Sequence, residues 1–93
     1  MSASFDDIAA YVRSGAWTAP LTNDEKLVLY SLFKQATQGD APESGPFSLI
    51  DPVGAAKFDA WRLLRGLPRD AARAAYVDEF NTLHARYGTR SRL

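Results

Sequence analysis

The sequence predicts an all-α fold: a four-helix bundle with a long loop between the second and third helices. Three observations support this prediction. Apolar residues recur at intervals of three and four over four separate segments, which is the spacing of helices packed on a core. Residues that begin or end helices stand at the boundaries of these segments. No segment alternates apolar and polar residues as a half-buried strand does.

The first predicted helix begins after Ser2 or Ser4, either of which is a suitable N-cap, and ends at Ser14-Gly15. The helix dipole favours the two aspartates in its first turn. Four apolar residues define its core face: Phe5, Ile8, Ala9 and Val12. The segment that follows is expected to be a loop held to the core by Trp17.

The second predicted helix begins at a capping box. Thr22 and Glu25 have the spacing at which their side chains satisfy each other's backbone N–H groups. The helix runs to about Gln38, because Gly39 accepts the left-handed backbone that closes helices. Its expected core face consists of Val28, Leu29, Leu32 and Ala36.

Residues 40–50 contain two prolines and a glycine and have no periodic pattern, so they are expected to form a crossover loop. Three apolar residues are expected to order this loop: Phe47, Leu49 and Ile50. Asp51-Pro52 then begins a third helix, which is expected to reach Leu64 before Gly66 stops the chain.

The fourth predicted helix begins at Pro68 and ends at Gly88. Its apolar stripe consists of Tyr76, Phe80, Leu83 and Tyr87. We expect Phe80 and Leu83 to be core residues, and His84, the single histidine, to be a surface residue. The basic tail 89–93 is expected to fray.

Composition narrows the classes of function. At 93 residues the chain is one domain, 1–93, large enough to bury about 60–65% of its unfolded surface. Eleven basic residues balance eleven acidic ones, so nucleic acid is not an expected partner. The absence of cysteine excludes disulfides and thiolate chemistry. With no apolar run of membrane-spanning length and no signal pattern, we expect a cytoplasmic protein.

One helical stripe carries candidate binding residues. Leu27, Tyr30 and Lys34 lie at i, i+3 and i+7 of the second helix, with Phe33 beside them. Taken alone, this pattern favours the ordinary interpretation, in which Tyr30 is a half-buried helix residue and Lys34 a solvated charge. Lys57 repeats the theme on the third helix, where it precedes two aromatic residues, Phe58 and Trp61.

Two longer motifs change that balance. The segment from Tyr30 to Asp40 resembles the Tyr-Ser-x-Tyr-Lys-Gln-Ala-Thr-x-Gly-Asp signature of the acyl-CoA-binding protein family. The segment from Gly54 to Trp61 is similar to that family's Gly-x-Ala-Lys-aromatic-Asp-Ala-Trp segment. The resemblance continues to Arg86-Tyr87-Gly88 and so covers nearly the whole chain. It implies a four-helix bundle that binds fatty-acyl-CoA thioesters without reacting with them.

The resemblance also implies roles for individual residues. The positions that serve the phosphates of coenzyme A in the family correspond to Arg13, Tyr30, Lys34 and Lys57. The position that packs on adenine corresponds to Phe33, and the tyrosine that reaches the nucleotide corresponds to Tyr76. The acyl chain is expected to lie over Leu27 and over the first helix near Ala9.

The sequence departs from the family pattern at several of these places. Phe33 replaces a tyrosine, which keeps the stacking face but removes a hydroxyl. Val53 and Ala55 replace lysines common in animal members, so a weaker positive field is expected. Arg13 and Phe58 are milder replacements, of lysine and tryptophan. The loop around Gly45 is about one residue longer than in the animal pattern.

The alternative to an acyl-CoA carrier is a helical protein–protein adaptor that kept the fold and lost the ligand. The retention of Tyr30, Lys34, Lys57 and Tyr76 argues against it. No nucleophile elbow, Gly-rich phosphate loop or metal-ligand cluster occurs in the sequence, so neither an enzyme nor a cofactor or metal is expected. Trp61 is expected in the core. We expect a monomer that makes transient contact with enzymes that use acyl-CoA.

Overall fold

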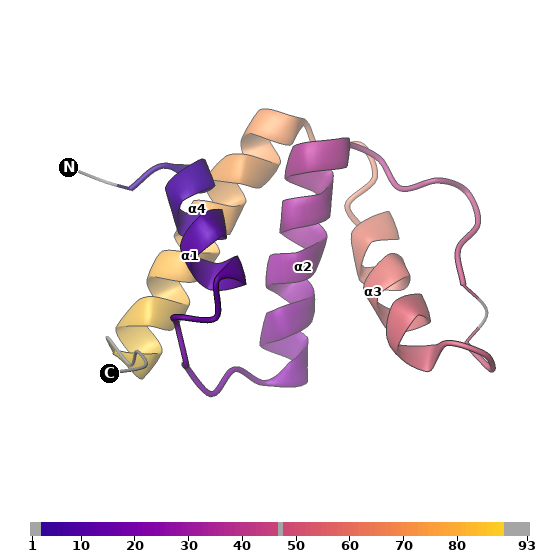
Figure 1. Ribbon diagram of the computed structural model, residues 1–93. Coiled ribbons are helices and arrows are strands. Elements are labelled where there is room, and N and C mark those ends of the chain that lie inside the picture. Colours follow the sequence, from indigo (N-terminus) through magenta and orange to yellow (C-terminus); the bar gives the residue numbers. More distant parts are fainter. Residues whose placement is uncertain (1–2, 47, 89–93) are drawn as a thin grey trace.

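The part of the chain that the computed structural model describes, residues 3–46 and 48–88, contains four helices and no strand. These are α1 (Phe5–Arg13), α2 (Asn23–Gln38), α3 (Pro52–Arg62) and α4 (Arg69–Tyr87) (Figure 1). The predicted all-α fold is therefore confirmed. The predictions for Phe47 and for the tail 89–93 lie outside the described residues.

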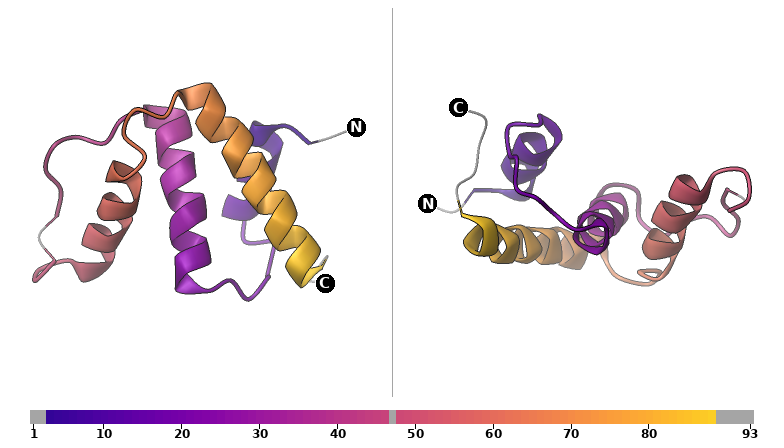
Figure 2. Two further views of the ribbon diagram at one scale, coloured as in Figure 1. Left: turned by 180° about the vertical axis from the view of Figure 1, so that it is seen from behind. Right: turned by 90° about the horizontal axis from the view of Figure 1, so that it is seen from below.

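The central helix is α2. It packs against α4 on one side and against α3 on the other, while α1 packs chiefly against α4. Figure 2 shows this arrangement from below, with α1 and α4 at one end, α2 in the middle and α3 at the other end. The molecule is elongated, with extents of 39 × 28 × 19 Å. Helix α2 is therefore the element that contacts both α3 and α4.

The main core joins α1, α2 and α4 and does not include α3. Its buried members are Ile8, Ala9, Trp17, Leu29, Leu32, Tyr76, Phe80 and Leu83. Trp17 fixes the loop after α1 as predicted, with its ring centroid 4.9 Å from that of Phe80. Each large apolar side chain buried here contributes about 1.5–3 kcal/mol, so this core holds three helices together. Helix α3, which lies outside this core, is held by separate contacts with α2.

The predicted starts of α1, α2 and α3 are confirmed by their caps, whereas α4 begins after Pro68 without a side-chain cap. The Ser4 hydroxyl accepts a hydrogen bond from the first turn of α1 at 3.2 Å. The capping box of α2 is complete, because Thr22 accepts from the backbone of Glu25 and Glu25 accepts from the backbone of Thr22. The Asp51 carboxylate caps α3 in the same way. Each cap satisfies N–H groups that have no partner within the helix.

Glu25 also joins the start of α2 to the end of α4. Its Oε1 accepts a hydrogen bond from the Tyr87 hydroxyl at 2.6 Å, and its Oε2 pairs with the Arg86 guanidinium. The same carboxylate therefore closes the capping box and holds two helix ends, which the sequence motif alone does not indicate. We call this set of contacts the Glu25 clamp.

The other end of α2 is held by a network around Gln35, which is 1% exposed. The Gln35 amide donates to Asp40 Oδ1 at 2.9 Å and to the Leu67 carbonyl at 2.8 Å. Asp40 Oδ1 also accepts from the Gly66 backbone, and Trp61 Nε1 donates to the carbonyl of the residue before Asp40. This Gln35 network ties the end of α2 to the turn between α3 and α4.

Two apolar predictions were wrong. Val28 is 41% exposed, because α3 and α4 cover two sides of α2 and leave a strip between them uncovered. Leu49 and Ile50 are 98% and 83% exposed and do not order the crossover loop. Polar contacts hold the start of that loop instead, since the Arg65 guanidinium donates to two of its carbonyl oxygens. Helix α3 is also two residues shorter than predicted, because tight turns replace its last turn.

The Glu25 clamp predicts that acid destabilises the fold. The Tyr87 hydroxyl, the Thr22 backbone N–H and Arg86 stabilise the ionised carboxylate and lower the pKa of Glu25 from 4.5 to about 2. Because the pKa is lower in the folded state than in the unfolded state, this stabilisation is complete above pH 4.5 and is lost as the pH falls through about 2. Urea unfolding at a series of pH values measures the loss.

The variant Glu25→Gln isolates this carboxylate. It should be less stable than the parent at neutral pH and should lose less stability on acidification. Asp40, whose pKa is also lowered by the Gly66 backbone N–H and Gln35, remains in the variant. It should cause the loss of stability that the variant still shows in acid. Asp78→Asn, a change of an exposed carboxylate on α4, is the control. If the free energy of unfolding falls equally with decreasing pH in Glu25→Gln and in the parent, the clamp is contradicted.

Candidate functional site

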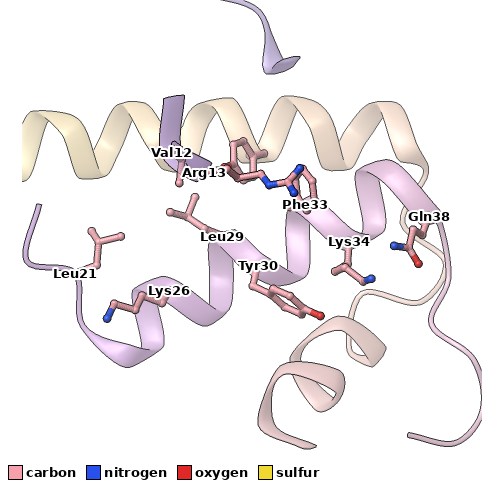
Figure 3. A pocket seen from close by; sticks show the side chains of 10 residues that line it. Val12, Arg13, Leu21, Lys26, Leu29, Tyr30, Phe33, Lys34 and Gln38 are labelled. Carbon is pink, nitrogen blue, oxygen red and sulfur yellow. The ribbon is translucent and has the colours of Figure 1, made fainter. Parts of the chain in front are cut away.

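A cavity of about 520 Å³ lies between α1 and α2 and is closed at its back by α4. We call it the α1–α2 cavity. Figure 3 shows its lining side chains, most of which come from one face of α2. The lining residues are Val12, Arg13, Leu21, Lys26, Leu29, Tyr30, Phe33, Lys34, Gln38 and Tyr76. The wall thus combines apolar side chains, three aromatic rings and three cations.

An aromatic cluster forms one wall of this cavity. The Phe33 ring lies nearly parallel to that of Phe5, with centroids 6.2 Å apart, and is tilted against Tyr76 at 6.3 Å. The Arg13 guanidinium lies over the Phe33 ring, 5.1 Å from its centroid. Residues from α1, α2 and α4 therefore meet at Phe33, which places a cation and a planar apolar surface side by side.

A second cavity, of about 370 Å³, lies between α2 and α3, and we call it the α2–α3 cavity. Its lining residues are Asn23, Lys26, Leu27, Tyr30, Pro52, Val53, Ala56 and Lys57. Lys26 and Tyr30 line both cavities and lie one helical turn apart. They form a ridge along α2 that a ligand occupying both cavities has to cross.

Aromatic rings hold the lysine side chains in place. Lys57 Nζ, from α3, lies 5.3 Å from the centroid of the Tyr30 ring on α2. Lys34 Nζ, from α2, lies 4.7 Å from the centroid of the Trp61 ring on α3. These reciprocal cation–π contacts bring both ammonium groups to the junction of α2 and α3. Each contact is worth about 0.5–1 kcal/mol at exposed sites, so both lysines remain available to an anion.

The structure brings the sequence-predicted residues together. Five of them line the α1–α2 cavity: Arg13, Tyr30, Phe33, Lys34 and Tyr76. Leu27 and Lys57 line the α2–α3 cavity, which Tyr30 joins to the first. Ala9 is 5% exposed, belongs to the core and lines neither cavity, while Val12, one turn further along α1, lines the α1–α2 cavity.

Sequence reasoning missed several lining residues. Lys26 is the most informative of them, because it precedes Tyr30 by four residues and Lys34 by eight. That spacing places it on the same stripe of α2 and could have identified it. The other missed residues that line one of the two cavities are Val12, Leu21, Leu29, Gln38, Asn23, Pro52, Val53 and Ala56. Gln38 continues the stripe of Lys26 and Lys34 and could have been identified in the same way, whereas the others are spread over α1, the loop after it, α2 and α3.

Val53 and Ala55, the two positions on α3 where lysines common in the family pattern are replaced, have different surroundings. Val53 is 65% exposed and lines the α2–α3 cavity, so a neutral side chain there reduces the positive charge at the cavity. Ala55 is buried at 7% exposure and lines neither cavity. A change at position 55 therefore acts on packing and not on the lining of either cavity.

Three further aromatic side chains lie outside the linings of the two cavities. Trp61 is 8% exposed and donates its indole N–H to the Gly39 carbonyl, as expected for a core residue. Phe58 is half-buried against Gly45, where any larger residue would overlap its ring. His84 differs from the prediction of a surface residue, since it is half-buried and stacks on Phe80 at 5.4 Å. It lines neither cavity.

Within residues 3–46 and 48–88, no three His, Asp or Glu side chains come close enough together to hold a metal ion. In the same residues, no helix combines the length and the apolar character that crossing a membrane requires.

The fold and the two cavities define a small helical bundle whose central helix carries cations and aromatic rings on one face. A family model described as acyl CoA binding protein matches residues 2–80. The chain is 47% identical over 88 residues to acyl-CoA-binding protein homolog 1 of Caenorhabditis elegans, covering 95% of this chain and 99% of the relative. The chain therefore belongs to the acyl-CoA-binding protein family.

Solved structures and a longer relative agree with this assignment. The structure resembles the crystal structure of the acyl-CoA-binding protein of Moniliophthora perniciosa with a TM-score of 0.81 and 36% identity. That match covers 92% of this chain and 82% of the other. The chain is also 49% identical over 63 residues to human enoyl-CoA delta isomerase 2, covering 66% of this chain but only 15% of that protein. A domain of this kind thus also occurs within a larger enzyme.

The surroundings of Tyr76 predict a late ionisation. Burial raises the pKa of Tyr76 above 10.0, although the charge of Arg13 opposes the shift. Stability that depends on the neutral phenol is therefore present below pH 10 and is lost as the pH rises through the higher folded pKa. In an alkaline titration followed by phenolate absorbance, Tyr76→Phe should lack one of the phenols that ionise at high pH in the parent.

Tyr87 supplies the internal reference for this titration. Its hydrogen bond to Glu25 raises the pKa of Tyr87, so one late phenol should remain in the variant. Loss of an early-ionising phenol in Tyr76→Phe would contradict the burial of Tyr76 against the cavity.

Proposed function

We propose that this chain binds medium- to long-chain fatty-acyl-CoA esters non-covalently and acts as a carrier and pool former for them. The observation that carries the proposal is the meeting of Arg13, Phe33 and Lys34 in one cavity of a chain that belongs to the acyl-CoA-binding protein family. The proposed site consists of Arg13, Leu27, Tyr30, Phe33, Lys34, Lys57 and Tyr76.

The cations supply the charge that the head group of the ligand needs. Coenzyme A carries a 3′-phosphate and a diphosphate, and phosphates bind best to guanidinium and ammonium donors. Arg13 and Lys34 approach from the α1–α2 cavity, and Lys57 approaches across the Tyr30 ring. Because the formal net charge of the chain is zero, this local cluster, and not the field of the whole protein, attracts the ligand.

Phe33 is proposed to pack on the adenine. The Arg13 guanidinium lies over the Phe33 ring in the structure, so an adenine stacked on that face displaces it. The displaced guanidinium remains beside the site and is then available to a phosphate. Arg13 thus covers an apolar ring before the ligand arrives and pairs with the ligand afterwards.

The acyl chain needs an apolar surface near the head group. Leu27 and Val53 provide such a surface in the α2–α3 cavity, together with neighbouring aliphatic atoms of α3. Each methylene removed from water contributes up to about 0.8 kcal/mol. A carrier of this kind shields the chain from water and does not need to react with the thioester.

The proposal also specifies what the protein does not do. We propose that it is not an enzyme and uses no cofactor, since the role assigned to each cavity residue is binding. His84, the one histidine, stacks on Phe80 and lines neither cavity. We further propose a cytoplasmic monomer that makes transient contact with enzymes that use acyl-CoA. The adaptor alternative is not favoured, because membership of the family and the retained cavity residues both point to a ligand.

Calorimetric titration with palmitoyl-CoA tests the proposal, with free coenzyme A and palmitate as separate controls. The parent protein should bind palmitoyl-CoA more tightly than either fragment, because only the intact thioester occupies both the charged and the apolar parts of the site. Equal affinity for palmitoyl-CoA and free coenzyme A would reject a carrier, since the acyl chain would then contribute nothing.

Removing the Lys34 ammonium should weaken binding. Lys34→Ala is expected to cost about 1.5–3 kcal/mol of binding free energy, the range for a hydrogen bond to a charged group. The free energy of unfolding should change by less than about 1 kcal/mol, since the cation–π contact with Trp61 is the main interaction lost.

The matched control for this variant is Arg62→Ala. It removes the same charge from an exposed position on α3 that lines neither cavity. Calorimetry should therefore give nearly parental affinity for the control. A Lys34→Ala protein that binds palmitoyl-CoA as tightly as the control would exclude Lys34 from the site.

Two substitutions at Phe33 distinguish a contribution of ring stacking from a contribution of hydrogen bonding. Phe33→Tyr keeps the ring and should bind as well as the parent or slightly better. Phe33→Ala should lose about 1–3 kcal/mol of binding, as other aromatic–base stacks do. Because Phe33 also packs against Phe5 and Tyr76, thermal unfolding of each variant is measured first. A folded Phe33→Ala protein with parental affinity would show that adenine does not pack here.

A further inference from the structure

Four cations line the two cavities, and Lys26 is the one to which the proposed binding of the head group assigns no role. It is exposed on α2 and lines both cavities beside Tyr30. Within residues 3–46 and 48–88, no carboxylate lies within ion-pairing distance of its ammonium. Its charge is therefore not neutralised by the acidic side chains that the structure describes.

The acidic residues of the same helical turn are directed elsewhere. Glu25 is held by Tyr87 and Arg86 on α4. Asp24 lines a third cavity, on the side of α2 where Val28 is exposed, and lines neither cavity that Lys26 lines. Neither carboxylate therefore lines the α2–α3 cavity beside Lys26.

The immediate neighbours of Lys26 in the α2–α3 cavity are mostly apolar. Leu27, Pro52, Val53 and Ala56 provide aliphatic atoms, and Asn23 adds an amide that can donate a hydrogen bond. The remaining lining residues, Tyr30 and Lys57, are the ones that the proposed function assigns to the phosphates. An ammonium group and an amide at the edge of an apolar cavity suit a ligand that is aliphatic along its length and anionic at one point.

The position of Lys26 along α2 identifies that point. Lys34 and Gln38 lie at one end of the cavity face and Lys26 and Leu21 at the other, with Tyr30 between them (Figure 3). Eight residues separate Lys26 from Lys34, which is about 12 Å along a helix. Lys26 is therefore too far from Lys34 to share one phosphate with it, and it borders the α2–α3 cavity, where the acyl chain is proposed to lie.

We propose that Lys26, with Asn23, selects acyl-CoA thioesters whose chain carries a free carboxylate at its far end. This inference rests on the proposed function, since it assumes that the head group lies at the Lys34 end. A methyl-ended chain of the same length places apolar atoms beside the ammonium and makes no hydrogen bond with it. An ω-carboxylate instead forms an ion pair there and keeps its methylenes on the apolar wall.

Calorimetry with two ligand series tests this inference. One series consists of ω-carboxyl acyl-CoA thioesters of increasing chain length, and the other of methyl-ended thioesters of the same lengths, including palmitoyl-CoA. In the parent, affinity for the ω-carboxyl series should pass through a maximum at the length that brings the carboxylate to Lys26. The methyl-ended series should show no such maximum at that length.

The variant Lys26→Met removes the charge and keeps an unbranched side chain. At the optimal length it should weaken ω-carboxyl binding about two- to fivefold, as expected for an exposed ion pair. It should strengthen binding of the methyl-ended ligand of that length. Arg62→Met changes the net charge equally at a position that lines neither cavity, and it should alter both series by the same small factor.

The outcomes separate this inference from the proposed function. Palmitoyl-CoA bound by the parent, with no maximum in the ω-carboxyl series, would overturn only the inference. A maximum that survives in Lys26→Met would also overturn it. If Lys26→Met weakens both series equally, Lys26 contacts a phosphate and not the chain end, and the inference is again wrong. Failure of both series to bind the parent would overturn the proposed function as well.

Discussion

The fixed position of α2 is the constraint on which the rest of the structure depends. This one helix contacts α3 and α4 and supplies residues to both cavities. The Glu25 clamp holds its first turn to α4, and the buried Gln35 holds its last turn to the segment between α3 and α4. Both anchors consist of hydrogen bonds, whose preferred geometry fixes direction as well as proximity. The cavity face of α2 is thereby oriented before any ligand arrives.

The cations of the site are positioned by aromatic rings, not by carboxylates. Lys34 lies over Trp61, Lys57 over Tyr30 and Arg13 over Phe33. A carboxylate partner would have to be displaced by an incoming phosphate, at the cost of breaking an ion pair. A ring restrains the cation weakly and leaves its hydrogen-bond donors free. This arrangement lets a chain with no net charge present a local anion site.

Sequence reasoning predicted the helices well because caps and periodicity are local, as Thr22 and Glu25 illustrate. It also selected residues that the fold brings into two adjoining cavities, because those on α2 share a stripe and the others were carried over from the family resemblance. It misjudged Val28 and Leu49, since exposure depends on which neighbour covers a helix or loop. Lys26 was missed although its spacing was visible. The contact of Glu25 with α4 could not have been predicted, because its partners are more than sixty residues away.

The central claim is that the ligand binds along the face of α2 shared by the two cavities. Amide NMR spectra recorded during a titration with palmitoyl-CoA test this claim directly. The account predicts that the largest shift changes follow Lys26, Tyr30 and Lys34, with further changes at Arg13 and Lys57. Changes concentrated instead around Val28, on the strip of α2 left uncovered between α3 and α4, would contradict the account.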